Sequence, residues 1–273
     1  MAVNYASKYS DKIDERFTLG SLTQGAVNQD YDWLGVETVN VYSIPTVAMN
    51  DYTASGTNRY GDPSELDNEV QELKVTQDRA FTFTIDKKSR DDTQMTMEAG
   101  KALQRQIDEV IIPEVDTYRL AAICAGAGST ETGTVTADNA YEAFLTVQAD
   151  LDENKAPQGG RVCYCSPSYY KYIKLDDTFT KMGDLATGIA INGQVGEIDG
   201  VPVVKVPSSY LPDGVNFVIT NPICTPGPEK LTDYTIHDNP PGISGWLVEG
   251  RIRYDAFVLN SKVGAIGVHM TTT

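Results

Sequence analysis

The sequence predicts an α+β protein in which antiparallel strands lie beside one long helix, with a smaller α/β unit inserted later in the chain. Threonines alternating with aromatic or aliphatic residues over 81–85 are typical of a half-buried strand. Apolar residues recur at helical spacing from 97 to 123, a run much longer than an average helix. Between 138 and 235, strand patterns alternate with helix patterns, which indicates an α/β arrangement.

Length and composition indicate a globular chain with a strongly acidic balance. The 273 residues include 22 Lys and Arg against 38 Asp and Glu, which gives a net charge of −16 and a pI near 4.4. Hydrophobic residues at 41% and charged residues at 22% are ordinary for a folded domain and argue against disorder. Tight binding of nucleic acid draws on basic surface, so this balance argues against a protein whose main role is to bind nucleic acid. A protein that encloses DNA without adhering to it is not excluded.

Targeting and redox features are those of a protein made in a reducing cytoplasm. Residues 1–8 lack the apolar core of a secretory signal, and the longest apolar stretch, 120–128, is too short to span a bilayer. No membrane partner is therefore expected. The cysteines are too few and too scattered for a disulfide scaffold. They are Cys124, Cys163, Cys165 and Cys224.

Residues 1–30 are predicted to form an N-terminal arm that has no core of its own. A short polar helix is expected over 7–17, followed by Gly20, Gly25 and several small polar residues. Such a segment gains order by lying on another surface.

Residues 31–90 are predicted to form an extended hairpin. Period-two patterns around 36–47 and over 70–85 indicate strands. The residues between them, 50–69, contain two glycines, a proline and almost no aliphatic side chains. A loop of this length is uncommon in a compact domain unless it has a function. We therefore expect the polar tip of the hairpin to lie far from its own core.

Residues 91–137 are predicted to hold one long helix and a linker. Residues 91–93, Asp-Asp-Thr, offer N-caps for a helix that begins near Thr93. About thirty residues at a rise of 1.5 Å would give a length of roughly 45 Å. Pro113 is expected to kink this helix rather than end it, because the apolar pattern resumes after it. The Ser-, Thr- and Gly-rich run 129–137 is expected to be a linker between subdomains.

Residues 138–235 are predicted to form the inserted α/β unit. A helix capped at Asp138 or Asn139 is expected first, and a second helix is opened by Ser166 and Pro167. The first helix is expected to bury one face, made of Tyr141, Phe144, Leu145, Gln148 and Leu151. Strands are expected at 161–165, 201–206 and 215–220.

The C-terminal residues 236–273 are predicted to return to the strands that precede the linker. Apolar residues alternate again between Trp246 and Val268. A strand pattern of this length needs a pairing partner, so residues 30–128 and 236–273 are expected to form one discontinuous platform.

The sequence lacks the common catalytic and phosphate-binding motifs. Only two histidines occur, His237 and His269, and no His-Glu-x-x-His, Gly-x-Ser-x-Gly or Walker A pattern is present. Cys163 and Cys165 lie on one side of a strand, but no second Cys or His pair stands at zinc-binding spacing. We interpret both thiols as buried core residues. No metal and no cofactor are expected.

Other polar groupings are interpreted as structural. The Asp pairs 91–92 and 176–177 are expected to be helix caps rather than an acid and a base. The tyrosines at 169, 170 and 172 are expected to pack or to line an exposed helical face. The glycines of 193–200 fit hairpin turns better than a phosphate cradle. No catalytic residue is assigned, and the protein is not expected to be an enzyme.

In this order, the segments resemble the Hong Kong 97-type fold of tailed-phage major capsid proteins. Four segments carry the resemblance: 76–86 as the strand entering the spine helix, 99–116 as the spine, 196–204 as an A-domain hairpin and 253–259 as the closing P-domain strand. The resemblance implies five regions: an N-arm (1–30), an E-loop hairpin with P-domain strands (31–90), the spine helix and linker (91–137), an A-domain (138–235) and returning P-domain strands (236–273).

The resemblance implies assembly through the E-loop and the N-arm. The expected E-loop residues are Tyr52, Arg59, Tyr60, Asp62 and Glu65, and the expected N-arm residues are Lys8, Lys12, Arg16 and Phe17, with Pro113 as the spine kink. Some relatives form a Lys–Asn cross-link. Here lysines at 74, 87 and 88 lie near the loop base but none lies at its tip, so no cross-linking residue is assigned. No long charged coiled-coil segment precedes the arm, so a fused scaffold domain is expected to be absent or removed.

The implied function is structural. Copies of the chain would form hexamers and pentamers of an icosahedral shell around phage DNA, held without sequence-specific contacts. The expected partners are the chain itself, a portal and a scaffold protein, with a decoration protein as a further candidate. The expected location is the virion capsid, after assembly in the host cytoplasm. Two alternatives stay open: an encapsulin-type nanocompartment shell, and a cytoplasmic enzyme acting on a small molecule.

Overall fold

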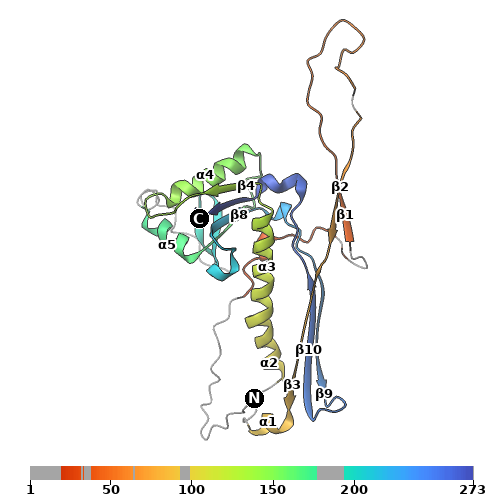
Figure 1. The fold of residues 1–273 in the computed structure, drawn as a ribbon, viewed down its shortest axis with the longest axis vertical. Helices are drawn as coiled ribbons and strands as arrows, with labels where there is room; N and C mark the ends of the chain where they lie inside the picture. The colour runs from red at the N-terminus through yellow and green to blue at the C-terminus, as the bar shows by residue number, and fades with distance from the viewer. Residues whose placement is uncertain are drawn as a thin grey trace.

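Three sheets and a long segmented helix make up the described part of the chain (Figure 1). The computed structural model describes residues 20–31, 33, 38–63, 65–92, 99–176 and 194–272. The helix runs down from a body that contains the six-stranded sheet. The strands of a three-stranded sheet run beside it, and a hairpin projects next to the body, away from the lower end of the helix.

The body is built on a mixed six-stranded sheet. In sheet order its strands are β4 (Ser129–Thr132), β11 (Gly267–Met270), β8 (Val215–Thr220), β5 (Val162–Cys165), β7 (Val201–Lys205) and β6 (Gln194–Ile198). The pairs β4–β11 and β5–β7 are parallel, and the other neighbours are antiparallel. Helices α4 (Ala140–Glu153) and α5 (Pro167–Leu175) belong to the same body. Strands and helices alternate here, as the sequence pattern predicted, but the sheet also includes β4 and β11 from outside 138–235.

Alternate side chains of this sheet enter two different cores. On β8, Phe217 and Ile219 pack with α4 and α5, whereas Val218 points to the opposite face. That opposite face meets Leu120 and Ile123 of the long helix. Because successive strand residues point to opposite sides, one sheet here binds two helical layers. All five residues are almost completely buried.

Local sequence signals account for the turns and caps of the body. Ser166 accepts a hydrogen bond from the Tyr169 amide and so caps α5, as predicted. Asp199 and Gly200 join β6 to β7 with positive φ at both positions, the geometry of a two-residue hairpin turn. Asn139 is the N-cap residue of α4, but its side chain makes no capping bond to that helix. It turns back and accepts from the Thr136 amide at 2.7 Å.

The long helix consists of α2 (Ala99–Gln106), a π-helical turn η2 (Ile107–Ile111) and α3 (Ile112–Ala125). The Ile112 amide donates to the Ile107 carbonyl, five residues back. Pro113 follows at once, in the first turn of α3, where its missing amide hydrogen is least costly. The sequence predicted a continuous pattern through Pro113, and the wider turn shows how the backbone accommodates it. A kink at this position remains a prediction.

A three-stranded antiparallel sheet lies along the long helix. Its order is β3 (Gln77–Asp86), β10 (Gly245–Tyr254) and β9 (Glu229–Asp238). Ile252 and Tyr254 pack against Ile111 and Val115 in a core of their own. The C-terminal segment was expected to pair with strands that precede the linker, and β10 pairs with β3 over its whole length.

The hairpin consists of β1 (Thr38–Ser43) and β2 (Glu69–Lys74), paired in register from Thr38 with Lys74 to Ser43 with Glu69. The residues between them, 44–68, are called the extended loop below. In Figure 1 this loop projects well clear of the rest of the chain. The predicted hairpin with a distant polar tip is thus present.

Short helices complete the described elements. They are α1 (Lys87–Asp92), η1 (Gln24–Ala26), η3 (Ser208–Tyr210), η4 (Pro222–Cys224) and η5 (Asn260–Ala265). The expected start of the long helix near Thr93 falls outside the described residues. Residues 91–92 were expected to be caps in front of a helix. They lie within helix α1 instead, which begins directly after β3.

Four further expectations are corrected. Residues 129–132 of the expected linker form β4, since they pair with β11 at the edge of the sheet. The C-terminal segment is divided: β10 joins the three-stranded sheet, but β11 joins the body, where β8 offers it an apolar strand. The boundary at 235/236 runs through β9. On α4, Leu145 is exposed and Val147 is buried in its place.

The structure predicts that Gly128 is needed where the long helix meets the body. Its amide donates to the Val263 and Ile266 carbonyls at 3.1 and 3.2 Å, and an added Cβ would lie 2.5 Å from the Val263 oxygen. Gly128→Ala should lower the free energy of unfolding by about 1–3 kcal/mol in urea titrations, because backbone must move. Gly159→Ala is the control, since nothing lies within 4 Å of its Cβ position. Equal midpoints for both variants would contradict the prediction.

Candidate functional site

The extended loop carries all five residues predicted for its tip. Tyr52 and Tyr60 meet edge to face, with ring centroids 5.2 Å apart. Nearby, Asn58 donates to Asp62 at 2.6 Å, and the Arg59 carbonyl accepts from the Thr53 amide at 3.1 Å. These local bonds give the tip a defined turn although it touches no core. Glu65, also predicted, is exposed in the same loop. Their role in assembly remains a prediction.

Exposed apolar side chains are concentrated on the hairpin. Of the thirteen large hydrophobic side chains exposed in the described part of the chain, eight lie between Tyr42 and Val70. Met49 is 98% exposed and Tyr60 is 83% exposed. Exposed apolar side chains concentrated in one segment favour a surface that another molecule covers. The hairpin is therefore the main candidate for an interaction surface.

The base of the hairpin is anchored to the segment that follows β10. The Gln71 side chain donates to the Val258 carbonyl and accepts from the Asn260 amide, both at 2.9 Å. Leu73 and Val75 are buried with Trp33 and Leu259 in a small core. This anchoring holds the base firmly while the loop beyond it stays exposed.

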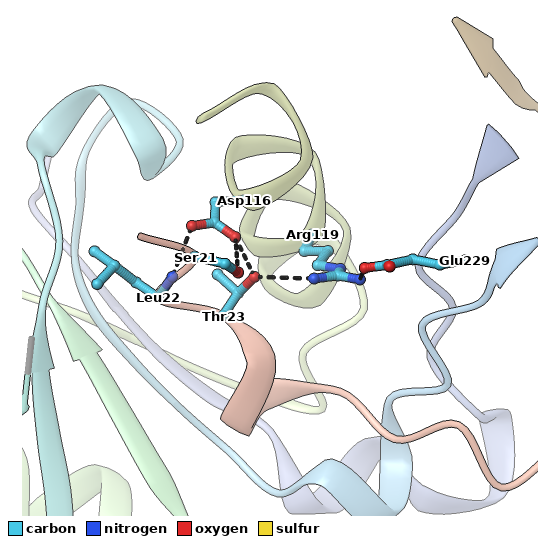
Figure 2. Close-up of polar contacts among 6 residues, drawn as sticks. All are labelled: Ser21, Leu22, Thr23, Asp116, Arg119 and Glu229. Atoms are coloured by element: carbon cyan, nitrogen blue, oxygen red, sulfur yellow. Dashed lines mark hydrogen bonds and ion pairs between the residues drawn. The ribbon is translucent and has the colours of Figure 1, made fainter. Parts of the chain in front are cut away.

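A second candidate site, called the arm junction below, joins residues 21–23 to the long helix (Figure 2). Asp116 of α3 is fully buried. It accepts hydrogen bonds from the Ser21 hydroxyl at 2.9 Å, the Leu22 amide at 2.8 Å and the Thr23 hydroxyl at 2.6 Å. One carboxylate thus satisfies three donors, which is the condition under which a charge is tolerated in the interior.

Arg119 lies one turn along the same helix and extends this site. Its guanidinium pairs with Glu229, at the start of β9, at 2.6 Å. It also reaches the Thr23 hydroxyl at 3.5 Å, so that Thr23 lies between the two charged helix residues (Figure 2). Arg119 is only 2% exposed. The same segment, 20–31, reaches the body, where Leu22 and Ala26 join the core.

The remaining predicted assembly residues are the four of the N-arm and Pro113. Lys8, Lys12, Arg16 and Phe17 lie outside the described residues. Pro113 lies one turn before Asp116, and its carbonyl accepts from the Thr117 hydroxyl at 2.7 Å. The structure brings Pro113 near the arm junction, but it brings none of the extended-loop residues there.

The thiols predicted to be structural are buried. Cys163 and Cys165 are completely buried, and burial raises the pKa of Cys163 well above its usual value and that of Cys165 to about 12. They therefore stay protonated and suit packing rather than metal binding. Within the described residues, no group of three or more His, Cys, Asp and Glu side chains is placed to hold a metal ion.

The other candidate chemical groups also have structural partners. Asp176 accepts from the Tyr141 amide at 3.0 Å, so it caps α4, where Asn139 does not. Asp177 lies outside the described residues. Tyr169 is buried and donates to the Ala140 carbonyl at 2.9 Å. Tyr170 lies near two lysine ammonium groups. Among the described residues, no helix has the length and apolar character needed to cross a membrane.

Sequence reasoning missed Asp116 and Arg119. A usable signal was present: both charges stand three positions apart inside an apolar helical stripe, where Val115 and Leu120 flank them. Charges on the buried face of a helix require partners, so such a pair marks a tertiary polar contact. The sequence did not say that residues 21–23 supply those partners.

At the arm junction, truncation of the Asp116 side chain should destabilise the folded subunit strongly. Asp116→Ala should lower the free energy of unfolding by roughly 3 kcal/mol, because it leaves buried donors of residues 21–23 without an acceptor. Asp62→Ala, which removes an exposed carboxylate, should change it by less than about 0.5 kcal/mol. Urea titration of both variants measures the difference. If the two variants unfold at the same midpoint, the junction does not stabilise the subunit.

Comparison with solved structures identifies the fold. The capsid of the cyanophage P-SCSP1u matches with a TM-score of 0.76 at 11% identity, over 98% of this chain and 93% of that one. Mycobacterium phage Che8 matches with 0.68 at 16% identity over 98% of both chains. The mature capsid of bacteriophage PhiM1 matches with 0.70 at 13% identity, over 99% and 93%. The expected Hong Kong 97-type fold is confirmed.

The family follows from the sequence itself. The search of curated protein sequences gave no match. A family model described as phage capsid protein matches residues 68–267, from the start of the hairpin's second strand to the last strand of the body. This match covers well over half of the chain, and the protein therefore belongs to the phage capsid protein family.

Proposed function

We propose that the chain assembles through its extended loop, which lies on a neighbouring copy in the shell. The observation that carries this proposal is the concentration of exposed apolar side chains between Tyr42 and Val70. Ordering such a loop costs conformational entropy that the isolated subunit does not recover. Contact with a neighbour would recover it by burying Met49, Tyr60 and the side chains around them.

The family gives the coarse function. Phage capsid proteins are structural, so the chain is the major structural protein of a phage head and its location is the virion capsid. We propose the finer arrangement of hexamers and pentamers. Many weak loop and arm contacts per subunit would then add up across a closed cage. The encapsulin alternative is not favoured, because the matching family is that of phage capsids.

The proposed partners follow from the same arrangement. A shell that fills with DNA needs a portal and, during assembly in the host cytoplasm, a scaffold, with a decoration protein on its outer surface as a further candidate. The net charge of −16 would repel the phosphate backbone and keep enclosed DNA from adhering. A purely structural role, without catalysis, fits the buried and protonated thiols and the carboxylates that serve as caps.

Removal of the loop tip tests the assembly role directly. Deletion of residues 55–66 should leave a folded subunit that no longer forms shells, because the hairpin base keeps its own core while the loop tip, with exposed Tyr60 and Leu66, is removed. Circular dichroism measures folding, and negative-stain microscopy measures assembly. A milder test variant is Tyr60→Ser, which should reduce shell yield. Its matched control is Leu145→Ser, which changes an exposed apolar residue on α4 and should leave shell yield unchanged. Shells of normal size after the deletion would rule out the loop as an assembly element.

The turn before Pro113 gives a prediction about shell curvature. Pro113→Ala restores an amide hydrogen that can bond the Glu109 carbonyl, so the π-helical turn loses its local cause and a straighter helix is favoured. The isolated subunit should be no less stable in urea titration, while microscopy should show aberrant sizes, sheets or tubes. Particles of unchanged diameter would show that Pro113 does not set the curvature of the shell.

A further inference from the structure

The chain changes sheets at Thr76. Strand β2 ends at Lys74 and pairs only within the hairpin, whereas β3 begins at Gln77 and pairs with β10. The backbone at residues 75–76 is therefore the link between the hairpin and the three-stranded sheet, and its conformation contributes to the direction of the hairpin relative to the long helix. Whatever fixes Thr76 also restrains where the extended loop points.

Asp255 fixes Thr76. One carboxylate oxygen of Asp255 accepts from the Thr76 amide at 2.8 Å and from the Thr76 hydroxyl at 2.9 Å. The other oxygen accepts from the Tyr118 hydroxyl and from the Ala256 amide, both at 2.8 Å. Asp255 is 2% exposed. Each of its oxygens thus has two donors, and a buried carboxylate held in this way has a single favoured orientation.

The contact with Tyr118 ties this point to the long helix. Tyr118 belongs to α3, and its ring meets Tyr254 edge to face with centroids 5.5 Å apart. Burial, followed by the hydrogen bond to Asp255, raises the pKa of Tyr118, so the phenol stays a donor across the physiological range. Through Asp255, the base of the hairpin and the helix are held by one side chain.

We propose that Asp255 is a positioning residue that sets the direction of the extended loop relative to the long helix. The consequence for shell formation rests on the function proposed above, but the positioning role itself is a property of one subunit. Gln71 holds the hairpin base against residues 258 and 260, so the base stays packed when Asp255 is changed. Asp255 supplies the angle, and the packed base supplies the attachment.

The test measures the distance between the paired strands of the hairpin and the helix in the full-length free subunit. Nitroxide labels are attached through an unnatural amino acid at the positions of Asn40 in β1 and Gln104 in α2, both exposed, which avoids the native cysteines. Double electron–electron resonance then gives the distance distribution. Asp255→Asn keeps the shape but turns one oxygen into an amide that cannot accept. It should raise the fraction of hairpins outside the native distance range by about tenfold.

Two further variants make the test decisive. Tyr118→Phe removes one donor, keeps the aromatic contact and should broaden the distribution less than Asp255→Asn does. Asp176→Asn changes another buried carboxylate, which caps α4 in the body, and should leave the distribution unchanged. If Asp255→Asn fails to fold, Tyr118→Phe decides. An unchanged distribution in Tyr118→Phe and in any folded Asp255→Asn, or equal broadening by Asp176→Asn, overturns the proposal.

Shell assembly by the same variants separates the two proposals. A broadened distribution together with reduced shell yield supports both. A broadened distribution with a normal yield of normal shells keeps the positioning role and counts against assembly through the extended loop. An unchanged distribution with lost shells overturns the positioning role, because the defect then arises elsewhere.

Discussion

The structure depends on the burial of two opposite charges, Asp116 and Arg119, on one turn of the long helix. A buried charge without partners costs several kcal/mol, so the helix can occupy this place only when other segments supply them. Residues 21–23 and Glu229 do so. The end of the arm segment, the helix and the start of β9 therefore become mutually fixed. An apolar contact would hold the helix as strongly but would permit sliding; directed hydrogen bonds from three donors do not.

The same helix links two separate cores. Its last turns place Leu120 and Ile123 against the six-stranded sheet, while Ile111 and Val115 pack on the three-stranded sheet. The body and the three-stranded sheet thus pack on the same long helix, and the hairpin extends beyond both (Figure 1). In a monomer this architecture leaves a large apolar surface in water. Under the assembly proposed above, a neighbouring copy would cover these exposed segments.

Elements with strong periodicity were predictable, and their partners were less so. The alternation over 81–85 predicted the strand that is β3, and the apolar tail predicted the strand that is β10, but the sequence did not specify that these two strands pair. The short strands were harder. Ser129–Thr132 is wholly polar, so its sequence is typical of a linker, and it becomes a strand only because β11 lies beside it. Likewise, β11 belongs to the body through β8, a choice that tertiary contacts make and local pattern does not.

The candidate sites divide in the same way. The extended loop was predictable because its composition excludes a core, and that property is local to residues 50–69. The buried carboxylates were not predictable, because their hydrogen-bond donors lie far along the chain. The donors to Asp116 lie between 93 and 95 positions from it, and Thr76 lies 179 positions from Asp255. A lone Asp in a strand sequence such as Arg253–Leu259 predicts only a turn or an exposed position. Its burial among four donors is a property of the fold, and for that reason it can set a direction that no local sequence specifies.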